Sequence, residues 1–261
     1  MQKQLKNFVK ALILAFQIDW IDTFRLNFFH LPFKQGRKLP ILLFKAKLHI
    51  MQGALVQLNV NNENCRFGMI KLGCQYSKNV LSSSVGIQID LRTGKLLFNG
   101  SGIIGCGSNL ITRKGGTIEF GKNFGISGNF SACAFQRIGI GNNLSCSWNV
   151  SIYDTDFHET ADLETGCKFP MTNCVIIGDN CWLCQKSTIL KGSCLPNWSI
   201  VGASALVNKN YKDYPPHNLF AGIPAKPLNK KIVRMDLKRI TDVSNWNVTS
   251  GFHLLNPLTK I

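Results

Sequence analysis

Histidine and cysteine are the side chains of this 261-residue chain best suited to acid–base or nucleophilic chemistry. The five histidines are His30, His49, His158, His217 and His253. His158 stands in the acidic segment DTDFHE at positions 154–159. A histidine suits a general base because its pKa lies near neutrality, and Asp156 could accept a hydrogen bond from the other ring nitrogen. On position alone, a catalytic base and an exposed loop histidine remain equally open, and either aspartate would serve to cap a turn.

A repeat with a period of six must position this segment. The phased apolar residues are Phe98, Ile104, Leu110, Ile118, Phe124, Phe130, Ile138, Leu144, Val150, Ile177, Leu183, Ile189, Leu195, Val201 and Val207. The first nine of these residues form three sets of three, and each set starts 20 residues after the one before. A helix or an alternating strand would show other spacings, so we predict coils of three short strands with one inward residue each and Gly or Asn at the turns. Stacked coils then bury one continuous core. Phase is lost in the polar insertion 154–174, and an insertion in a solenoid often marks its binding face.

Four further segments are distinctive: DTDFH at 154–158, IGDNCW at 177–182, VGASALVNK at 201–209 and AGIPAK at 221–226. Together they resemble the hexapeptide-repeat acyltransferases, in particular the branch of galactoside, maltose and polysaccharide O-acetyltransferases. The resemblance implies a left-handed parallel β-helix, an all-β solenoid. The handedness rests on the resemblance alone, because the general crossover rule predicts the opposite hand.

The resemblance also implies an acetyl-CoA-dependent O-acetyltransferase that modifies a sugar or a surface-polysaccharide precursor by direct transfer, with His158 as general base. It further implies a homotrimer that holds acetyl-CoA in the groove between neighbouring subunits, and no metal. The positions carried over for the cofactor are Gln185, Ala203, Asn208, Lys209 and Lys226, and Asn129 is carried over for the acceptor. Two positions depart from the family pattern, because the asparagine and aspartate that bind the sugar in galactoside acetyltransferases align with Ser127 and Phe135.

Three alternative functions use a similar fold or similar groups. A noncatalytic solenoid would merely present a surface, and the Asp-rich setting of His158 argues against it. A carbonic anhydrase on the same fold would need three histidines around zinc, whereas His158 is alone among the repeats. Acylation of an amino sugar at nitrogen needs similar groups and stays open.

The remaining sequence divides into an N-terminal helical segment 1–45, the β-helix 46–225 and a basic tail 226–261. A helix is expected from Leu5 to about Phe29, ended by Pro32 and Pro40. We favour packing on the coil stack for this helix over weak contact with a membrane surface. The net charge of +16 favours anionic partners, but no nucleic-acid-binding motif is present.

The cellular compartment is inferred from the same features. The ten cysteines are scattered, and no export signal or bilayer-spanning apolar run is evident. We therefore expect free thiols and a cytoplasmic protein, peripheral at most to the inner membrane.

Overall fold

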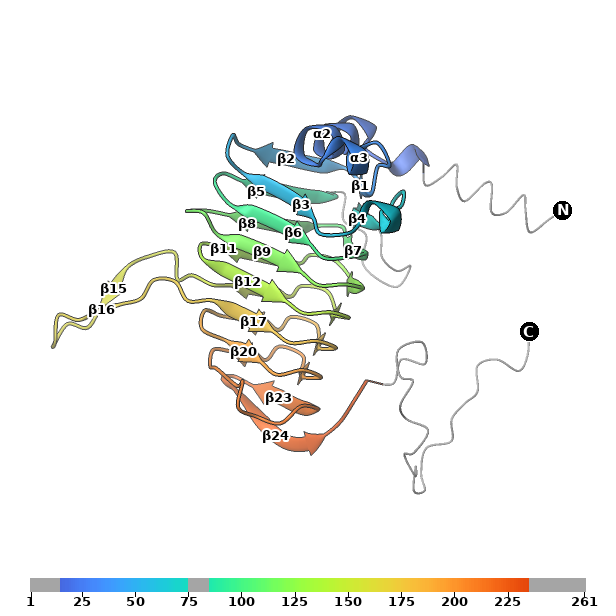
Figure 1. Cartoon of the computed structure of the whole chain (residues 1–261). Coiled ribbons are helices and arrows are strands. Elements are labelled where there is room, and N and C mark those ends of the chain that lie inside the picture. Colours follow the sequence, from blue (N-terminus) through green and yellow to red (C-terminus); the bar gives the residue numbers. More distant parts are fainter. Residues whose placement is uncertain (1–14, 75–84, 235–261) are drawn as a thin grey trace, which may run out of the picture.

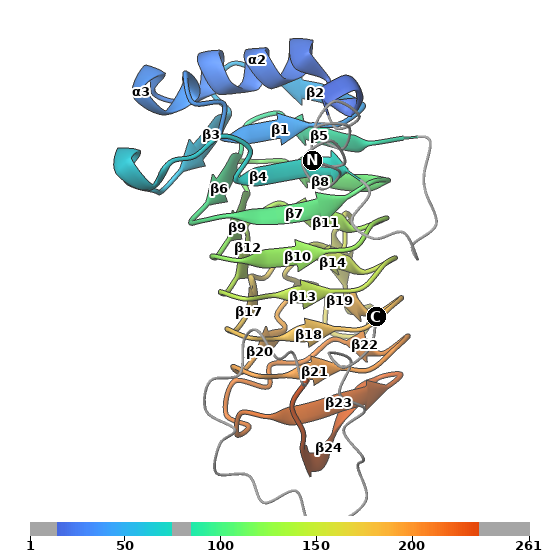
Figure 2. The ribbon, with the colours of Figure 1, turned by 90° about the vertical axis from the view of Figure 1, so that its right-hand side faces the viewer.

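The computed structural model describes residues 15–74 and 85–234, and their strands wind into a single stack of coils. Figures 1 and 2 show this stack from two sides, with the N-terminal helices at one end and β24 at the other. Strands of successive coils pair in parallel, as the hexad repeat predicts. The predicted left-handed parallel β-helix is confirmed.

The coils build three sheets, here called A, B and C, to which each coil contributes one strand in turn. Sheet A contains β1 (Ile41–Leu43), β4 (Ile70–Cys74), β7 (Gly102–Gly105), β10 (Phe124–Ile126), β13 (Ser145–Cys146), β18 (Trp182–Leu183), β21 (Ile200–Val201), β23 (Asn218–Gly222) and β24 (Ala225–Lys231). Sheet B contains β2 (Ala46–Ile50), β5 (Ile87–Leu91), β8 (Ser108–Thr112), β11 (Ser131–Ala134), β14 (Ser151–Tyr153), β19 (Thr188–Ile189) and β22 (Leu206–Val207). Sheet C contains β3 (Leu55–Leu58), β6 (Lys95–Phe98), β9 (Thr117–Phe120), β12 (Arg137–Ile140), β17 (Val175–Ile177) and β20 (Cys194–Leu195).

The phased apolar residues form the core of the stack. All fifteen are at most 2% exposed. Between β6 and β9, Leu96 pairs with Ile118 and Phe98 pairs with Phe120. Alternate residues of a strand face the same side, so Ile118 and Phe120 both point inward and form two neighbouring columns. The two extra residues of this coil lie in the turn 113–116, which is longer than the turn 135–136 of the next coil.

The turns between sheets use the predicted residue types. Asn129, Asn143 and Asn149 all adopt positive φ at corners of the stack. Asparagine tolerates this conformation better than most residues, which explains why it recurs between the inward positions. A short 3-10 helix, η1 (Asn62–Asn64), lies in the connection between β3 and β4.

The N-terminal helices close one end of the stack. The single helix expected up to Phe29 is interrupted, because Asp19 caps a new helix, α2 (Trp20–His30), by accepting a hydrogen bond from Asp22 N at 3.2 Å. This helix ends before Pro32, as predicted, and the four-residue α3 (Phe33–Gly36) follows. The expected residues 5–14 of the helix lie outside the described part. The predicted packing is observed, since Asn27 donates from Nδ2 to the Ile41 carbonyl of β1 at 2.7 Å.

An antiparallel strand closes the other end. β24 pairs with β23 in the opposite direction and is the last strand of sheet A. Sheet A therefore extends to Lys231, beyond the end of the β-helix expected at residue 225. At its start, sheet A includes Ile41, which pairs with Ile70 and precedes the start of the β-helix expected at residue 46. Residues 235–261 of the expected tail lie outside the described part.

Candidate active site

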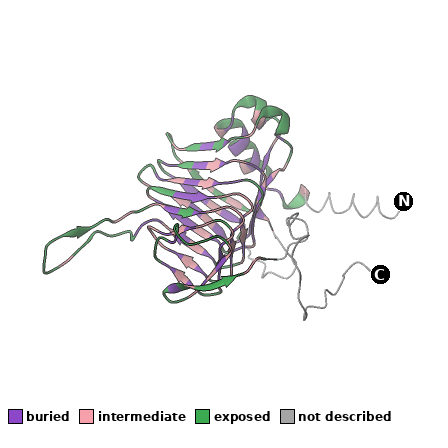
Figure 3. Ribbon diagram, turned by 60° about the horizontal axis from the view of Figure 1, so that its bottom comes forward, coloured by how far each residue is buried: buried purple, intermediate pink, exposed green. Residues whose placement is uncertain are grey.

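The insertion predicted to carry His158 leaves the stack between β14 and β17, at the edge where sheet B turns into sheet C. We call this edge the B–C corner. The insertion forms a two-stranded antiparallel hairpin of β15 (Thr160–Ala161) and β16 (Lys168–Phe169). It projects from the body of the molecule in Figure 1, and Figure 3 shows that nearly all of it is exposed. The hairpin base is closed by Asp156 N donating to Met171 O at 2.9 Å.

Asp154 fixes the root of the insertion. Its side chain is fully buried and accepts hydrogen bonds from Phe135 N at 2.8 Å and Gln136 N at 2.7 Å. Its carbonyl accepts from Asn173 N at 2.9 Å on the returning arm. Burial raises the pKa of this carboxyl, and the backbone donors oppose that rise. Asp154 therefore has the turn-capping role, tying both arms to the preceding coil.

Asp156, the expected partner of His158, contacts a lysine. Its Oδ2 lies 2.5 Å from Nζ of Lys191, whose side chain is only 24% exposed. Lys191 also donates to the carbonyl of Pro170 on the returning arm. This lysine, on the turn after β19, thus joins the two arms of the hairpin to the body of the stack. The hydrogen bond from His158 to Asp156 stays a prediction.

An aromatic cluster precedes the histidine directly. The Phe157 ring meets the rings of Phe135 and Tyr153 edge-on, with centroids 5.8 Å apart in each pair. Phe157 has a φ of 65°, and its N–H donates to Thr155 Oγ1 at 3.0 Å. Packing of Phe157 on Tyr153 of β14 and on Phe135 of the turn after β11 anchors the exposed His158 next to it at the B–C corner. Sequence reasoning missed this cluster and Lys191, although the unusual aromatic of the DTDFH segment was a usable signal.

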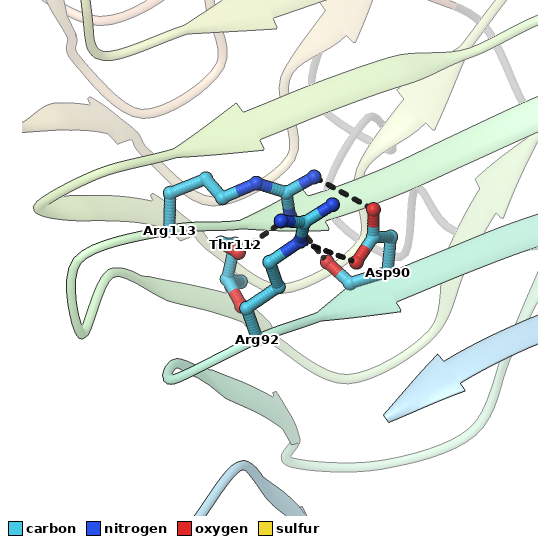
Figure 4. Close-up of polar contacts among 4 residues, drawn as sticks. All are labelled: Asp90, Arg92, Thr112 and Arg113. Atoms are coloured by element: carbon cyan, nitrogen blue, oxygen red, sulfur yellow. Dashed lines mark hydrogen bonds and ion pairs between the residues drawn. The ribbon is translucent and has the colours of Figure 1, made fainter. Parts of the chain in front are cut away.

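Basic side chains continue along the same corner on the preceding coils. The guanidinium of Arg113 donates to Asp90 Oδ2 at 2.6 Å and to the carbonyl of Thr112 at 2.9 Å (Figure 4). Arg92 lies 3.8 Å from the other oxygen of Asp90. The ammonium of Lys114 stands 5.8 Å from the ring centroid of Phe135. Two arginines share one carboxylate, so this stretch of the corner carries net positive charge.

The cofactor candidates fall on two edges of the stack. Asn208 and Lys209 follow β22 and lie at the B–C corner, on the same edge as His158. Gln185, Ala203 and the acceptor candidate Asn129 precede sheet-B strands and lie at the opposite edge, the A–B corner. There the Gln185 carbonyl accepts from Ser204 N at 2.9 Å, so adjacent coils bring Gln185 and Ala203 together.

Lys226 is exposed on β24, at the closed C-terminal end, where it pairs with Ala221. Within one chain, His158 and Lys209 therefore lie on the same edge of the stack, whereas Gln185, Ala203 and Asn129 lie on another. The strands of sheet B separate the two corners, by about 10 Å for a three-residue strand such as β14.

Two hollows among the described residues lie away from this corner. Two adjoining cavities of about 320 and 410 Å³ share Met69, Ser101 and Asn123, at the edge where sheet C turns into sheet A. Neither cavity includes a predicted site residue. We give the B–C corner precedence over these hollows, because groups suited to acid–base chemistry gather there.

None of the ten cysteines forms a disulfide, as expected. Burial raises the pKa of Cys133 to about 11 and that of Cys181 to about 12, and it also raises the pKa of Cys146. A thiol with such a pKa carries little thiolate near neutral pH. These cysteines fill the core and are poor nucleophiles.

Known proteins similar to this chain include several acetyltransferases. A putative acetyltransferase of Schizosaccharomyces pombe is 32% identical over 120 residues, which cover 44% of this chain and 54% of the relative. Galactoside O-acetyltransferase of Escherichia coli is 29% identical over 119 residues, covering 44% of this chain and 55% of the relative. The predicted resemblance to the hexapeptide-repeat acetyltransferases is confirmed. The chain spans about half the length of these two curated relatives.

Other comparisons add a weaker relative and similar solved structures. A putative lipopolysaccharide biosynthesis O-acetyl transferase of E. coli, WbbJ, is 24% identical over 145 residues, covering 52% of this chain and 72% of the relative. The crystal structure of the polySia-specific acetyltransferase NeuO has a TM-score of 0.45 at 19% identity, covering 77% of this chain and 89% of that one. No family model matches the chain.

Proposed function

We propose that this protein transfers an acetyl group from acetyl-CoA to a hydroxyl of a sugar, with His158 as the general base. The observation that carries the proposal is the placement of His158. It stands on an insertion rooted in the stack by Asp154, Lys191 and Phe157, in a chain whose relatives are acetyltransferases. A base held on a rigid scaffold beside an open edge suits the deprotonation of an acceptor that arrives from solvent.

The proposed reaction is a direct transfer. His158 takes the proton of the acceptor hydroxyl as its oxygen attacks the thioester carbonyl. The new carbon–oxygen bond forms, the carbon–sulfur bond breaks, and coenzyme A leaves as a thiolate that can regain the proton from the imidazolium. The raised pKa values of Cys133, Cys146 and Cys181 disfavour a route through an acetyl-cysteine.

A homotrimer completes the proposed site. His158 and the pair Gln185–Ala203 lie on opposite edges of sheet B, which favours a cofactor groove shared between two chains. In a closed three-fold ring, the B–C corner of one chain can face the A–B corner of the next. The ring then has three equivalent grooves, and no corner is left without a partner. Asn208, Lys209 and Lys226 would meet acetyl-CoA around this groove, and Asp156 would assist His158.

The proposed class of acceptor rests on the relatives. The relatives include one named for galactoside and one named for lipopolysaccharide biosynthesis, which favours a sugar or a surface-polysaccharide precursor. Phe135 replaces the aspartate expected for a galactoside, so a plain galactoside is not the proposed acceptor.

A coenzyme A donor and ten free thiols favour the cytoplasm, with the protein at most peripheral to the inner membrane.

Mass spectrometry of reaction mixtures tests this function. The protein is incubated with acetyl-CoA and a panel of free sugars, nucleotide sugars, amino sugars and oligosaccharides. An acetyl ester on a sugar hydroxyl supports the proposal, whereas an amide on an amino sugar would reassign the activity to N-acetylation. Absence of any acetylated product across the panel, with coenzyme A binding also absent, would favour a noncatalytic solenoid. Product detection is preferred to a thiol reagent, because the chain itself holds ten free cysteines.

A further inference from the structure

The outward face of α2 is apolar. Ile21 is 75% exposed and Phe29 is 80% exposed, while Phe24 and Phe28 are 44% and 40% exposed. The inward face of the same helix, with Thr23, Leu26 and Asn27, already packs on the stack. A helix on the end of a soluble domain usually turns polar residues to solvent. The apolar residues of the outward face are therefore not explained by the core.

The exposed rings form a continuous strip. Trp20 and Phe24 have ring centroids 5.9 Å apart, Phe24 and Phe28 lie 6.0 Å apart, and Phe28 and Phe33 lie 6.3 Å apart. The strip runs along α2 onto the first residue of α3. We call it the aromatic strip. A contiguous exposed apolar surface of this kind marks an interaction site more often than scattered apolar residues do.

The charges around the aromatic strip are mostly positive. From residue 19 to residue 38 there are four basic residues and two acidic residues. One acidic residue, Asp22, pairs with Arg25 at 2.7 Å, and the other, Asp19, caps α2. Lys34 and Arg37 are exposed on and directly after α3. The preceding sequence, residues 1–14, adds Lys3, Lys6 and Lys10 and no acidic residue.

We propose that the aromatic strip docks this end of the stack onto an anionic phospholipid bilayer. Aromatic and aliphatic side chains would enter the boundary between headgroups and acyl chains, and the neighbouring cations would pair with lipid phosphates. Among the described residues no helix is long and apolar enough to cross a bilayer, so this contact is with the surface. Figure 1 shows α2 and α3, which carry the strip, at one end of the stack, whereas the hairpin of β15 and β16 projects from the side.

Three-fold assembly would strengthen this contact. In the proposed trimer, parallel stacks place three aromatic strips at the same end. One contact of a few side chains binds weakly, but three linked contacts act at a high effective concentration. Vesicle binding can be measured without acetyl-CoA or an acceptor, so a loss of membrane contact can be distinguished from a loss of turnover.

Vesicle sedimentation tests the proposal with the full-length protein. Vesicles contain phosphatidylcholine and phosphatidylglycerol in a roughly three-to-one ratio, and pure phosphatidylcholine serves as the uncharged comparison. We expect the wild type to sediment with the anionic vesicles and much less with the neutral ones. The double variant Phe24→Ser/Phe28→Ser should lower the partition coefficient by about tenfold or more, because two half-exposed rings lose their contact with the acyl boundary. The matched control is Leu228→Ser, since Leu228 is also 44% exposed but lies on β24 at the opposite end.

Three results would overturn the proposal. The wild type could fail to sediment with anionic vesicles. The double variant could bind as tightly as the wild type while removal of residues 1–14 abolishes binding, which would assign the contact to that segment. Light scattering could show that the double substitution halves the particle mass, which would make the aromatic strip an interface between copies. Circular dichroism of each variant verifies that the β-helix is retained.

Discussion

At the scale of single residues, the insertion separates two roles that the sequence places side by side. Asp154 and Asp156 are two positions apart, yet Asp154 is buried against the preceding coil and Asp156 is half-exposed and bound to Lys191. Only the fold reveals this division, because Lys191 lies beyond the hairpin in the chain. The same contact ties both hairpin arms to the body, so it determines where His158 stands.

His158→Ala should lower kcat by roughly 10²–10⁴ and leave the KM for acetyl-CoA nearly unchanged, because a base acts in the transition state and not in binding of the donor. Steady-state kinetics with the acceptor identified above measures both constants. His49→Ala is the control, since His49 is exposed on β2 at the far end of the stack. Wild-type turnover in His158→Ala, or an acetyl-cysteine trapped during the reaction, would remove His158 from its role.

Lys191→Met should lower kcat by about tenfold with little change in the KM for acetyl-CoA, because the hairpin loses an anchor while the cofactor groove is untouched. Lys191→Arg should recover most of the activity, since the guanidinium can also pair with Asp156. The control is Lys122→Met, at an exposed corner of the stack away from the hairpin.

A double-mutant cycle with Asp156→Asn separates two readings of Asp156. If Asp156 acts through Lys191, Asp156→Asn should cost nothing more in the Lys191→Met background. Additive losses in kcat would instead mean that Asp156 supports His158 directly, as the sequence alone predicts.

At the scale of elements, each short strand is held by its inward residue. Ile189 on β19 is fully buried between Ile152 of β14 and Val207 of β22. Ile189→Asp would bury an unpaired carboxylate and should lower the free energy of unfolding by roughly 3–5 kcal/mol. Thermal and denaturant unfolding followed by circular dichroism measures the loss.

The neighbouring position provides the control for this prediction. Thr188 precedes Ile189 and faces the opposite side of the strand, so Thr188→Asp should change stability far less. Equal stability of the two aspartate variants would contradict the observed orientation of β19.

At the scale of the whole molecule, the separation of candidate groups predicts assembly. Light scattering should give about three times the monomer mass. Mixing inactive His158→Ala with inactive Ala203→Trp, unfolding and refolding the two together, should restore part of the activity, because some grooves in mixed trimers pair an intact His158 with an intact Ala203. Two inactive His158 variants mixed in the same way should stay inactive. A monomer with full activity would refute the shared groove.

Much of this architecture could be predicted from the sequence, because every coil of a solenoid repeats the same pattern of inward apolar residues and turn residues. The six-residue phase predicted the buried positions, and the loss of phase predicted the insertion around His158. The repeat could not distinguish the two inward columns, because the six-residue spacing includes Ile118 but not Phe120, the partner of Phe98. The contact of Lys191 with Asp156 and the outward face of α2 were also out of reach, since periodicity says nothing of which distant groups meet or which face is left uncovered.

The two closed ends of the stack have a further consequence for solubility. A parallel β-helix has no natural limit, because its last coil presents free backbone donors and acceptors on which another coil could grow. At one end, Asn27 binds the β1 carbonyl of Ile41 and α2 lies across the opening. At the other end, the reversed strand β24 offers a proline without an N–H, Pro227, and the lysines Lys226, Lys230 and Lys231. Such an edge repels a second copy. The same features that limit the number of coils therefore also protect the protein from end-to-end polymerisation into fibrils.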